Sequence, residues 1–293
     1  MHRQQPEKLD EDWEECIMPE MPEIETIRRS LEPHIKGRKI ENVEVLLARQ
    51  IKWPEPEAFV ARILQEDIVG LERIGKYLLL QLSNQVSLIF HLRMTGQLVY
   101  VAAGAADASH HNRVIIYLDD GARLVFSDTR TFGTLYAMHQ DELWRIRGMA
   151  EMGPEPLSEK FTPEYLAEAV AGRKTRIKSF LLDQSKVGGL GNIYVDEALF
   201  LAGVHPMRLA GSLTGDEIQR LHEAVNRVIA DGIADGGTTF RDYRDGNGGK
   251  GSHQDNLFVY GRDGEACKRC GTLIAKTKVG GRGTRFCPSC QKI

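Results

Sequence analysis

The chain has 293 residues, of which 42% are hydrophobic and 27% charged, so it is long enough to bury two cores and carry a small appendage. No stretch approaches the roughly 18 consecutive apolar residues of a membrane span. The N-terminus also lacks the basic and then apolar pattern of a secretory signal. These features argue against a membrane or secreted protein, and we expect a cytosolic one without a membrane partner.

The net charge of −3 argues against a nucleic-acid partner until its distribution is considered. Residues 1–17 hold six acidic and two basic side chains, a charge of −4, which leaves +1 on the other 276 residues. From Arg262 to Ile293, eight basic residues stand against two acidic ones, a charge of +6. An electropositive end of this kind is typical of a nucleic-acid-binding surface.

Four of the five cysteines lie in this basic end as two Cys-x-x-Cys pairs, sixteen residues apart: Cys267, Cys270, Cys287 and Cys290. Each pair can place two thiolates on one turn, and two such turns complete a tetrahedral zinc site. Two disulfides are the alternative, which a reducing cytosol disfavours. We expect one structural Zn²⁺, because a segment of about 30 residues buries too little core to fold without it.

Residues 1–17 lack periodicity and indicate a disordered extension that is absent from the mature protein. A buried helix is predicted next, because Pro22 suits a first helical turn. One apolar stripe follows at helical spacing, formed by Ile24, Ile27, Leu31 and Ile35. From Lys39 to about Met138 short apolar or alternating runs, at 77–82, 86–92, 114–118 and 124–126, predict an antiparallel β-sandwich.

After residue 153 the apolar spacing changes to that of helices, predicted at 163–170, 177–183, 193–201 and 216–233. Residues 236–251 are rich in Gly, Asp and Asn and predict a mobile loop, which in this length range often serves as a lid. Residues 257–260 predict a strand leading into the metal finger. The sequence therefore predicts an α+β protein with a β-sandwich domain at 18–150, a helical domain at 151–253 and a zinc finger at 254–293.

Six motifs and the four cysteines, in chain order, give residues 18–293 a resemblance to the formamidopyrimidine-DNA glycosylases. The motifs are Met18-Pro19-Glu20-x-Pro22-Glu23-x-Glu25-Thr26, Gly75-Lys76-Tyr77-Leu78, His91-Leu92-Arg93-Met94-Thr95-Gly96, Asp128-x-Arg130-x-Phe132-Gly133, Gly189-Leu190-Gly191-Asn192-Ile193-Tyr194 and Tyr260-Gly261-Arg262. The resemblance implies a sandwich with a leading helix, a helix–two-turn–helix element and a β-hairpin zinc finger. It also implies a monomeric repair enzyme that excises 8-oxoguanine and formamidopyrimidines from double-stranded DNA, and then cleaves the abasic site by β,δ-elimination.

The resemblance assigns four catalytic residues. Pro19 matches the N-terminal proline whose secondary amine forms a Schiff base with the sugar, and an α-amino group of pKa near ~8 is partly neutral at physiological pH. Glu20 matches the general acid/base at the sugar. Lys76 matches the proton donor for β-elimination, and Arg282 the phosphate-gripping arginine implicated in δ-elimination. Without the surrounding motifs, Glu20 would be interpreted as a helix-start carboxylate and Lys76 as a solvated strand-end lysine.

The resemblance also assigns the contacts to DNA. A flipped base leaves a gap that side chains must fill, and Met94, Arg130 and Phe132 match the filling residues. His111, Arg130 and Lys174 match contacts to the DNA backbone. The family often has a second histidine two positions after the first, where this chain has Arg113.

The segment 178–201 resembles the helix–two-turn–helix element. Its glycines allow the backbone to approach a phosphate, and Asn192 is expected at a helix start where free N–H groups favour an anion. Lys178 is expected to add positive charge there. The loop 236–251 corresponds to the family's lid over the flipped base, which makes it a lesion-capping loop.

Pro19 is inert in the sequence as written, because a proline inside a chain is a tertiary amide with no basic lone pair. A translation start at Met18 would remove this problem, since an initiator methionine before proline is trimmed. Trp13-Glu14-Glu15 can be encoded by DNA containing GGGAGGA, a ribosome-binding sequence at suitable spacing from Met18. Proteolytic exposure of Pro19 is a second possibility.

Two other functions remain open. If Pro19 is never exposed, the same fold is a catalytically silent protein that binds lesion-containing DNA. The endonuclease VIII branch, which prefers oxidised pyrimidines, is the nearer alternative, although Met94, Arg130, Phe132 and the long 236–251 loop favour the purine-oriented branch.

Overall fold

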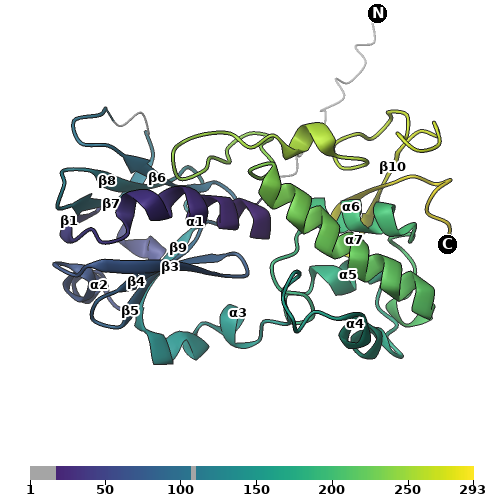
Figure 1. The fold of residues 1–293 in the computed structure, drawn as a ribbon, viewed down its shortest axis with the longest axis horizontal. Helices are drawn as coiled ribbons and strands as arrows, with labels where there is room; N and C mark the ends of the chain where they lie inside the picture. Colours follow the sequence, from purple (N-terminus) through teal and green to yellow (C-terminus); the bar gives the residue numbers. More distant parts are fainter. Residues whose placement is uncertain (1–17, 107–109) are drawn as a thin grey trace, which may run out of the picture.

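The computed structural model describes residues 18–106 and 110–293. A β-rich part and a helical part lie side by side, and the first helix reaches from one to the other (Figure 1). The predicted disordered extension, residues 1–17, lies outside the described residues. Within them, no helix is both long enough and apolar enough to cross a membrane.

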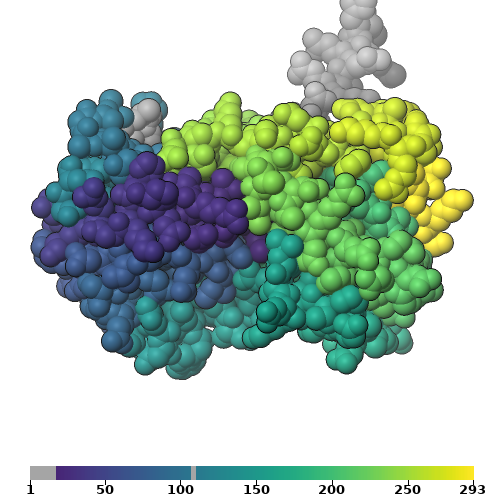
Figure 2. All heavy atoms as spheres, in the orientation of Figure 1, coloured from purple at the N-terminus to yellow at the C-terminus, as the bar shows by residue number. Residues whose placement is uncertain are grey.

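Helix α1 (Met21–Ile35) begins where the sequence predicts it, with Pro22 in its first turn. The predicted apolar stripe is buried: Ile24, Ile27, Leu31 and Ile35 are at most 1% exposed. The helix contacts strands β3, β4 and β6 and also helix α7 of the other part. Figure 2 shows α1, in purple, lying directly against the green atoms of the helical part.

Two sheets form the N-terminal part, and together they confirm the predicted sandwich. The five-stranded sheet has the order β2-β9-β5-β4-β3 and the four-stranded sheet the order β1-β7-β8-β6. All pairs are antiparallel except β2 with β9. One core contains buried residues from both sheets and from α1. The strands are β1 (Ile40–Val45), β2 (Ile51–Trp53), β3 (Ile68–Ile74), β4 (Tyr77–Leu82), β5 (Val86–His91), β6 (Gly96–Val101), β7 (Asn112–Leu118), β8 (Arg123–Asp128) and β9 (Thr134–His139).

One helix inside the sandwich was not predicted. Helix α2 (Pro56–Ile63) carries a proline in its first turn and buries Phe59 and Ile63, four residues apart, against the sheet. Its signals are those of a short amphipathic helix, but eight residues give a weak periodicity within a strand-rich region. Short helical turns also follow β1 and β9: η1 (Ala48–Gln50), η2 (Gln140–Arg145) and α3 (Arg147–Ala150).

The helical part has its own core, and its four main helices lie within one residue of the predicted ranges. They are α4 (Pro163–Val170), α5 (Ile177–Leu182), α6 (Asn192–Ala202) and α7 (Gly215–Ala234), with short turns η3 (Ala210–Ser212) and η4 (His253–Asn256). Helix α7 begins at a capping box, in which Thr214 accepts the Glu217 N–H and Glu217 accepts the Thr214 N–H. The mixed α+β class is confirmed.

The predicted strand at 257–260 is wrong. Three consecutive N–H groups, of Phe258, Val259 and Tyr260, donate to the carboxylate of Glu197 on α6 at 2.8–2.9 Å. A backbone whose donors converge on one carboxylate cannot form a strand ladder. The apolar side chains of this segment instead pack in the two cores beside α6.

The loop 236–251 differs from the expected mobile segment because its polar groups find partners in the sandwich. The Gly246 N–H donates to Ser30 Oγ of α1 at 2.8 Å, and the Tyr100 N–H of β6 donates to the Gly246 carbonyl at 2.7 Å. The hydroxyl of Tyr243 donates to the Glu23 carbonyl at 3.3 Å. The loop therefore lies along α1 and β6 and ties the two parts together.

The C-terminal finger is a hairpin of β10 (Ala275–Val279) and β11 (Arg282–Phe286). Gly280 and Gly281 join the strands with φ of 58° and 77°, a left-handed pair that suits a two-residue hairpin turn. An ion pair holds the hairpin on the helical part: Lys178 Nζ of α5 lies 2.7 Å from Asp196 Oδ1 of α6, and both side chains are 0% exposed. The Asp196 carboxylate also accepts the Arg285 N–H at 2.9 Å.

Removing one member of this ion pair should destabilise the protein strongly. Asp196→Ala leaves the Lys178 ammonium buried without its carboxylate, and we expect a loss of about 3–5 kcal/mol in the free energy of unfolding. Urea denaturation measures the loss. The control is Asp231→Ala, which breaks the exposed Arg227–Asp231 pair and should cost about 0–1 kcal/mol. Equal losses for the two variants would contradict the role given to the buried pair.

Candidate active site

The start of α1 lies against the glycine-rich turn that precedes α6. The Met21 N–H donates to the Gly189 carbonyl at 3.1 Å, and Glu20 Oε1 accepts the Ile193 N–H at 2.9 Å. A Cβ on Gly191 would lie 2.3 Å from Glu20 Cδ, so this position admits no side chain. The residue after Pro19 is thus held by the helical part of the molecule.

Glu20 and Lys76 are both buried, and their opposite charges interact. Glu20 is 2% and Lys76 6% exposed. Burial raises the pKa of Glu20 to about 7, against the opposing field of Lys76. Burial lowers the pKa of Lys76, while Glu20 raises it and Arg282 and Arg93 lower it further. Lys76 therefore lies within electrostatic reach of Arg282 and of Glu20, the residue that follows Pro19.

Glu23 joins three segments at this site, although sequence reasoning assigned it no role beyond its place in the opening motif. Its carboxylate accepts the Glu20 N–H at 2.9 Å, the Tyr194 hydroxyl at 2.7 Å and the Thr238 N–H at 2.7 Å. These donors come from the start of α1, from α6 and from the loop after α7. No local pattern could have revealed the contacts, because two of the donors lie more than 170 residues away.

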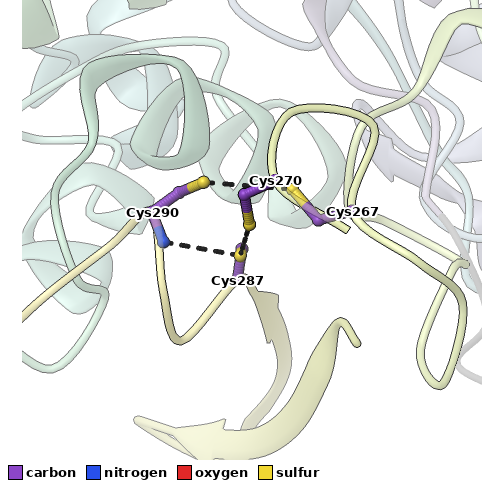
Figure 3. A group of neighbouring side chains, drawn as sticks. All are labelled: Cys267, Cys270, Cys287 and Cys290. Carbon is purple, nitrogen blue, oxygen red and sulfur yellow. Dashed lines mark hydrogen bonds between the residues drawn. The ribbon is translucent and has the colours of Figure 1, made fainter. Parts of the chain in front are cut away.

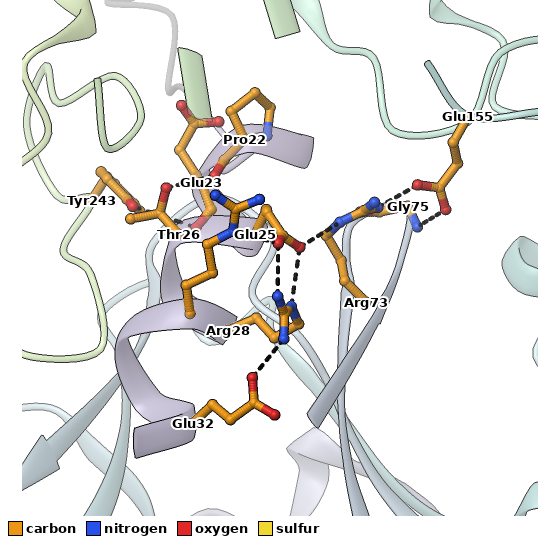
Figure 4. A network of polar contacts seen from close by, with 11 residues as sticks. Pro22, Glu23, Glu25, Thr26, Arg28, Glu32, Arg73, Gly75, Glu155 and Tyr243 are labelled. Atoms are coloured by element: carbon orange, nitrogen blue, oxygen red, sulfur yellow. Dashed lines mark hydrogen bonds and ion pairs between the residues drawn. The ribbon is translucent and has the colours of Figure 1, made fainter. Parts of the chain in front are cut away.

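A second carboxylate network connects the linker between the two parts with the strand turn that carries Lys76 (Figure 4). Glu155 accepts the Gly75 N–H at 2.7 Å and pairs with Arg73 at 2.5 Å. Arg73 also pairs with Glu25 of α1 at 3.4 Å, and Glu25 in turn pairs with Arg28 at 2.9 Å. The position of the Gly75 turn thus depends on α1 and on the linker.

The residues expected to fill a gap in DNA lie on two neighbouring turns. Met94, half-buried, is in the turn between β5 and β6, and Arg130 and Phe132 are in the turn between β8 and β9. Phe132 is 51% exposed, and the Arg130 guanidinium lies 5.1 Å from its ring centroid. His111 and Lys174 are exposed, as a contact to the DNA backbone requires.

Lys178 does not lie where its expected contact with a phosphate would need it. Its side chain is fully buried, and its ammonium donates to Asp196 and to the Gly283 carbonyl of the finger hairpin at 2.7 Å. Asn192 is the first residue of α6 as predicted, and its amide also donates to the Gly283 carbonyl, at 3.1 Å. Arg282, exposed at the start of β11, directly precedes this carbonyl.

The four finger cysteines converge on one point (Figure 3). All four sulfurs lie within 4.8 Å of one another, with Cys267 and Cys290 at 4.0 Å and Cys270 and Cys287 at 3.5 Å. These distances rule out the disulfide alternative, which needs about 2.05 Å. They suit tetrahedral zinc, whose ~2.3 Å bonds to sulfur place the thiolates roughly 3.8 Å apart. The cysteines therefore form the site of one structural zinc.

Removing the zinc should unfold the finger and displace Arg282. Chelation is expected to lower affinity for duplex DNA by at least about tenfold, because the finger's own core is small. Amide hydrogen exchange in β10 and β11 and a DNA-binding titration measure the two effects. Added zinc should restore both. A zinc-free protein that keeps its slow exchange and its affinity would contradict the structural role of the metal.

Three family models match the chain in order. Residues 18–135 match the formamidopyrimidine-DNA glycosylase N-terminal domain, residues 152–244 the H2TH domain of the same glycosylase, and residues 264–293 a zinc finger found in FPG and IleRS. The formamidopyrimidine-DNA glycosylase of Pelotomaculum thermopropionicum is 48% identical over 276 residues, covering 94% of this chain and 100% of that protein. That of Symbiobacterium thermophilum is 49% identical over 276 residues, with coverages of 94% and 90%.

Solved structures agree with these matches. A complex between the Lactococcus lactis Fpg and an abasic site containing DNA has a TM-score of 0.88 at 37% identity, and covers 94% of this chain and 100% of that one. MutM in complex with carbocyclic 8-oxo-G containing DNA has a TM-score of 0.87 at 38% identity, with the same coverages. The fold, the buried pair at the start of α1, the four-cysteine finger and these likenesses lead to one conclusion: this chain belongs to the formamidopyrimidine-DNA glycosylase family.

Proposed function

We propose that this chain excises oxidised purines, 8-oxoguanine and formamidopyrimidines, from duplex DNA and then cleaves the strand at the abasic site. The observation that carries the proposal is the buried Glu20–Lys76 pair beside Pro19, at the junction of the two parts of the molecule. The exposed Phe132 and Arg130 supply a surface that can enter a duplex. The proposal is also supported by similar proteins named formamidopyrimidine-DNA glycosylase and by solved structures of similar proteins bound to DNA with an abasic site or 8-oxoguanine.

The proposed reaction starts at the amine of Pro19. The amine attacks C1′ of the sugar, the bond to the damaged base breaks, and its electron pair leaves with the base. The nitrogen then loses its proton and its electron pair forms a C=N bond to C1′, while the C1′–O4′ bond breaks and O4′ takes up a proton, which opens the sugar ring. The resulting iminium withdraws electrons and acidifies the C2′ hydrogen, so that elimination of the phosphates follows. Glu20, whose raised pKa keeps it partly protonated at neutral pH, acts as general acid/base at the sugar. Lys76, whose pKa burial lowers, exchanges the proton of β-elimination, and Arg282 serves δ-elimination.

Exposed side chains and side chains that hold the finger hairpin both have proposed roles in DNA binding. We assign Met94, Arg130 and Phe132 to the gap left by the flipped base, and His111, Arg130 and Lys174 to the DNA backbone. Lys178 and Asn192 act on DNA through the hairpin that carries Arg282, because both side chains donate to the Gly283 carbonyl. The contacts of 236–251 with Glu23 and with Ser30 of α1 support the lesion-capping role that we propose for it.

The organisation we propose is a catalytic domain at 18–150, a DNA-binding helical domain at 151–253 and a finger at 254–293. The separation of the two main cores supports the first boundary. We further propose that the protein acts as a monomer in the bacterial cytosol, where chromosomal DNA lies.

Catalysis requires Pro19 to be the first residue of the working protein. A chain that begins at Pro19 should form a covalent adduct with DNA containing an abasic site when borohydride is added, because its free secondary amine makes a reducible iminium. The chain that begins at Met1 should form none, since its Pro19 nitrogen is an amide. The family model begins at residue 18, which supports a start at Met18. Gel electrophoresis of the trapped complex measures the outcome.

The matched control is the Pro19 chain with one glycine added before the proline, which keeps the fold and blocks the amine. Absence of an adduct with the Pro19 chain would contradict the lyase mechanism and leave a lesion-binding protein. The intact mass of active natural protein gives a further check, because activity in a protein that begins at Met1 would contradict the role of Pro19.

A separate experiment measures the excision of 8-oxoguanine and of thymine glycol side by side. The faster excision identifies whether oxidised purines or oxidised pyrimidines are the preferred substrates.

Base excision should weaken on the alkaline side because Glu20 loses its proton as the pH rises through its pKa of about 7. Lys76→Met removes the positive charge that opposes this raised pKa, so the alkaline limb should move to higher pH in that variant. Single-turnover release of 8-oxoguanine, measured from pH 6 to 9 (roughly the range in which the groups titrate), tests the shift. Arg227→Met, at an exposed distant position, is the control. An alkaline limb at the same pH in Lys76→Met would contradict the assignment to Glu20.

A further inference from the structure

We propose that Thr95 and Asp128 form a positioning pair that fixes the two DNA-entering turns to each other and so sets how fast they insert into the duplex. The first wedge loop is defined as residues 92–95 and carries Met94. The second wedge loop is defined as residues 129–133 and carries Arg130 and Phe132. The inference rests on the proposed function, because the wedge loops are assigned to the gap in DNA there.

Each wedge loop contains a residue in a strained backbone conformation. Arg93, next to Met94, has φ of 57°, and Thr131, between Arg130 and Phe132, has φ of 60°. Residues other than glycine rarely adopt this left-handed region, and a β-branched threonine adopts it least readily. Such conformations persist only when surrounding contacts hold them. The contacts at the base of the two loops therefore maintain the shape of both loops.

The hydroxyl of Thr95 bridges the two loops. It donates to Asp128 Oδ1 at 2.5 Å, and it accepts the Arg130 N–H at 3.0 Å. Thr95 is 7% and Asp128 1% exposed, so water competes little with either bond. One hydroxyl at the end of the first wedge loop therefore fixes the backbone of the second loop directly before Thr131.

The other carboxylate oxygen of Asp128 closes the second wedge loop. Asp128 Oδ2 accepts the Gly133 N–H at 2.8 Å and the Gln50 amide at 2.7 Å. A Cβ on Gly133 would lie 2.6 Å from Phe126 Cζ and 3.1 Å from this oxygen, so the approach requires glycine. The carboxylate thus holds both ends of a five-residue loop and links them to the first loop through Thr95.

Arg113 fixes the backbone of Asp128 itself, and this gives a structural role to the position where the family often has histidine. Arg113 Nε donates to the Asp128 carbonyl at 2.9 Å, and the Asp128 N–H donates to the His111 carbonyl at 3.0 Å. The start of β7 thereby clamps the end of β8. Because the wedge loops are ordered before DNA arrives, less conformational entropy is lost when they enter the stack.

The test compares Thr95→Val, which removes the hydroxyl at similar shape, with Thr95→Ser, which restores it. Thr134→Val is the matched control, since the Thr134 hydroxyl is buried without a partner among the residues that the structure describes. All variants begin at Pro19 and are complete otherwise. Stopped-flow fluorescence of 2-aminopurine, placed beside 8-oxoguanine in duplex DNA, reports the insertion step. Borohydride trapping on single-stranded DNA with an abasic site measures formation of the covalent intermediate. A single strand has no duplex base stack into which the wedge loops must insert.

We expect insertion to slow by about tenfold in Thr95→Val, because two buried hydrogen bonds are lost. Thr95→Ser and Thr134→Val should stay within roughly twofold of the wild type, and trapping on single strands should stay within roughly twofold for every variant. Insertion at the wild-type rate in folded Thr95→Val would overturn the proposal. So would an equal slowing in Thr134→Val, or an equal loss of single-strand trapping, because either would indicate a general structural defect.

Two further outcomes are distinguishable. If the wild type neither excises 8-oxoguanine nor forms an adduct, the proposed function fails, whereas a defect confined to insertion concerns the positioning pair. If thermal denaturation shows that Thr95→Val does not fold, Arg113→His provides the test, since it removes the bond from Arg113 Nε to the Asp128 carbonyl and so loosens the backbone of the positioning pair. It should slow insertion by about threefold with unchanged trapping on single strands. A wild-type insertion rate in folded Arg113→His would then overturn the proposal.

Discussion

Two hydrogen bonds hold the start of α1 against the glycine-rich turn before α6, from Met21 to Gly189 and from Ile193 to Glu20. The nucleophile proposed at Pro19 belongs to the sandwich by sequence, yet its neighbour is positioned by the helical part. The site therefore exists only while the two parts are docked. The loop 236–251 and the Glu155 network also stabilise this docking, because each joins the two parts at another point.

Buried carboxylates make most of these long-range connections. Glu23, Asp128, Asp196 and Glu197 are each at most 2% exposed, and each accepts hydrogen bonds from another segment. A carboxylate can accept several hydrogen bonds at once, so one side chain can satisfy donors that no regular element pairs. This arrangement lets irregular turns, which carry the proposed DNA contacts, be held as firmly as strands.

The sequence predicted those features that depend on local patterns. The apolar stripe of α1 and the main helices followed from periodicity, and the zinc ligands followed from the spacing of four cysteines. The false strand at 257–260 and the expected phosphate contact of Lys178 share one cause. Their partners, Glu197 and Asp196, lie on α6, outside the local sequence of either segment. The residues around 257–260 and around Lys178 therefore give no indication of these contacts. Glu23 and Asp128 were visible as motif residues, whereas their bonding roles needed the fold.

The chemistry proposed for Pro19 has a consequence for how this protein can be extended. Any residue joined before the proline turns its amine into an amide, so the gene tolerates no upstream fusion that remains attached. The opposite end carries no such restriction: Ile293 is 83% exposed and follows the last zinc ligand. With the role proposed for Pro19, affinity tags, fluorescent proteins and new domains gained during evolution are compatible with activity at the carboxyl end alone.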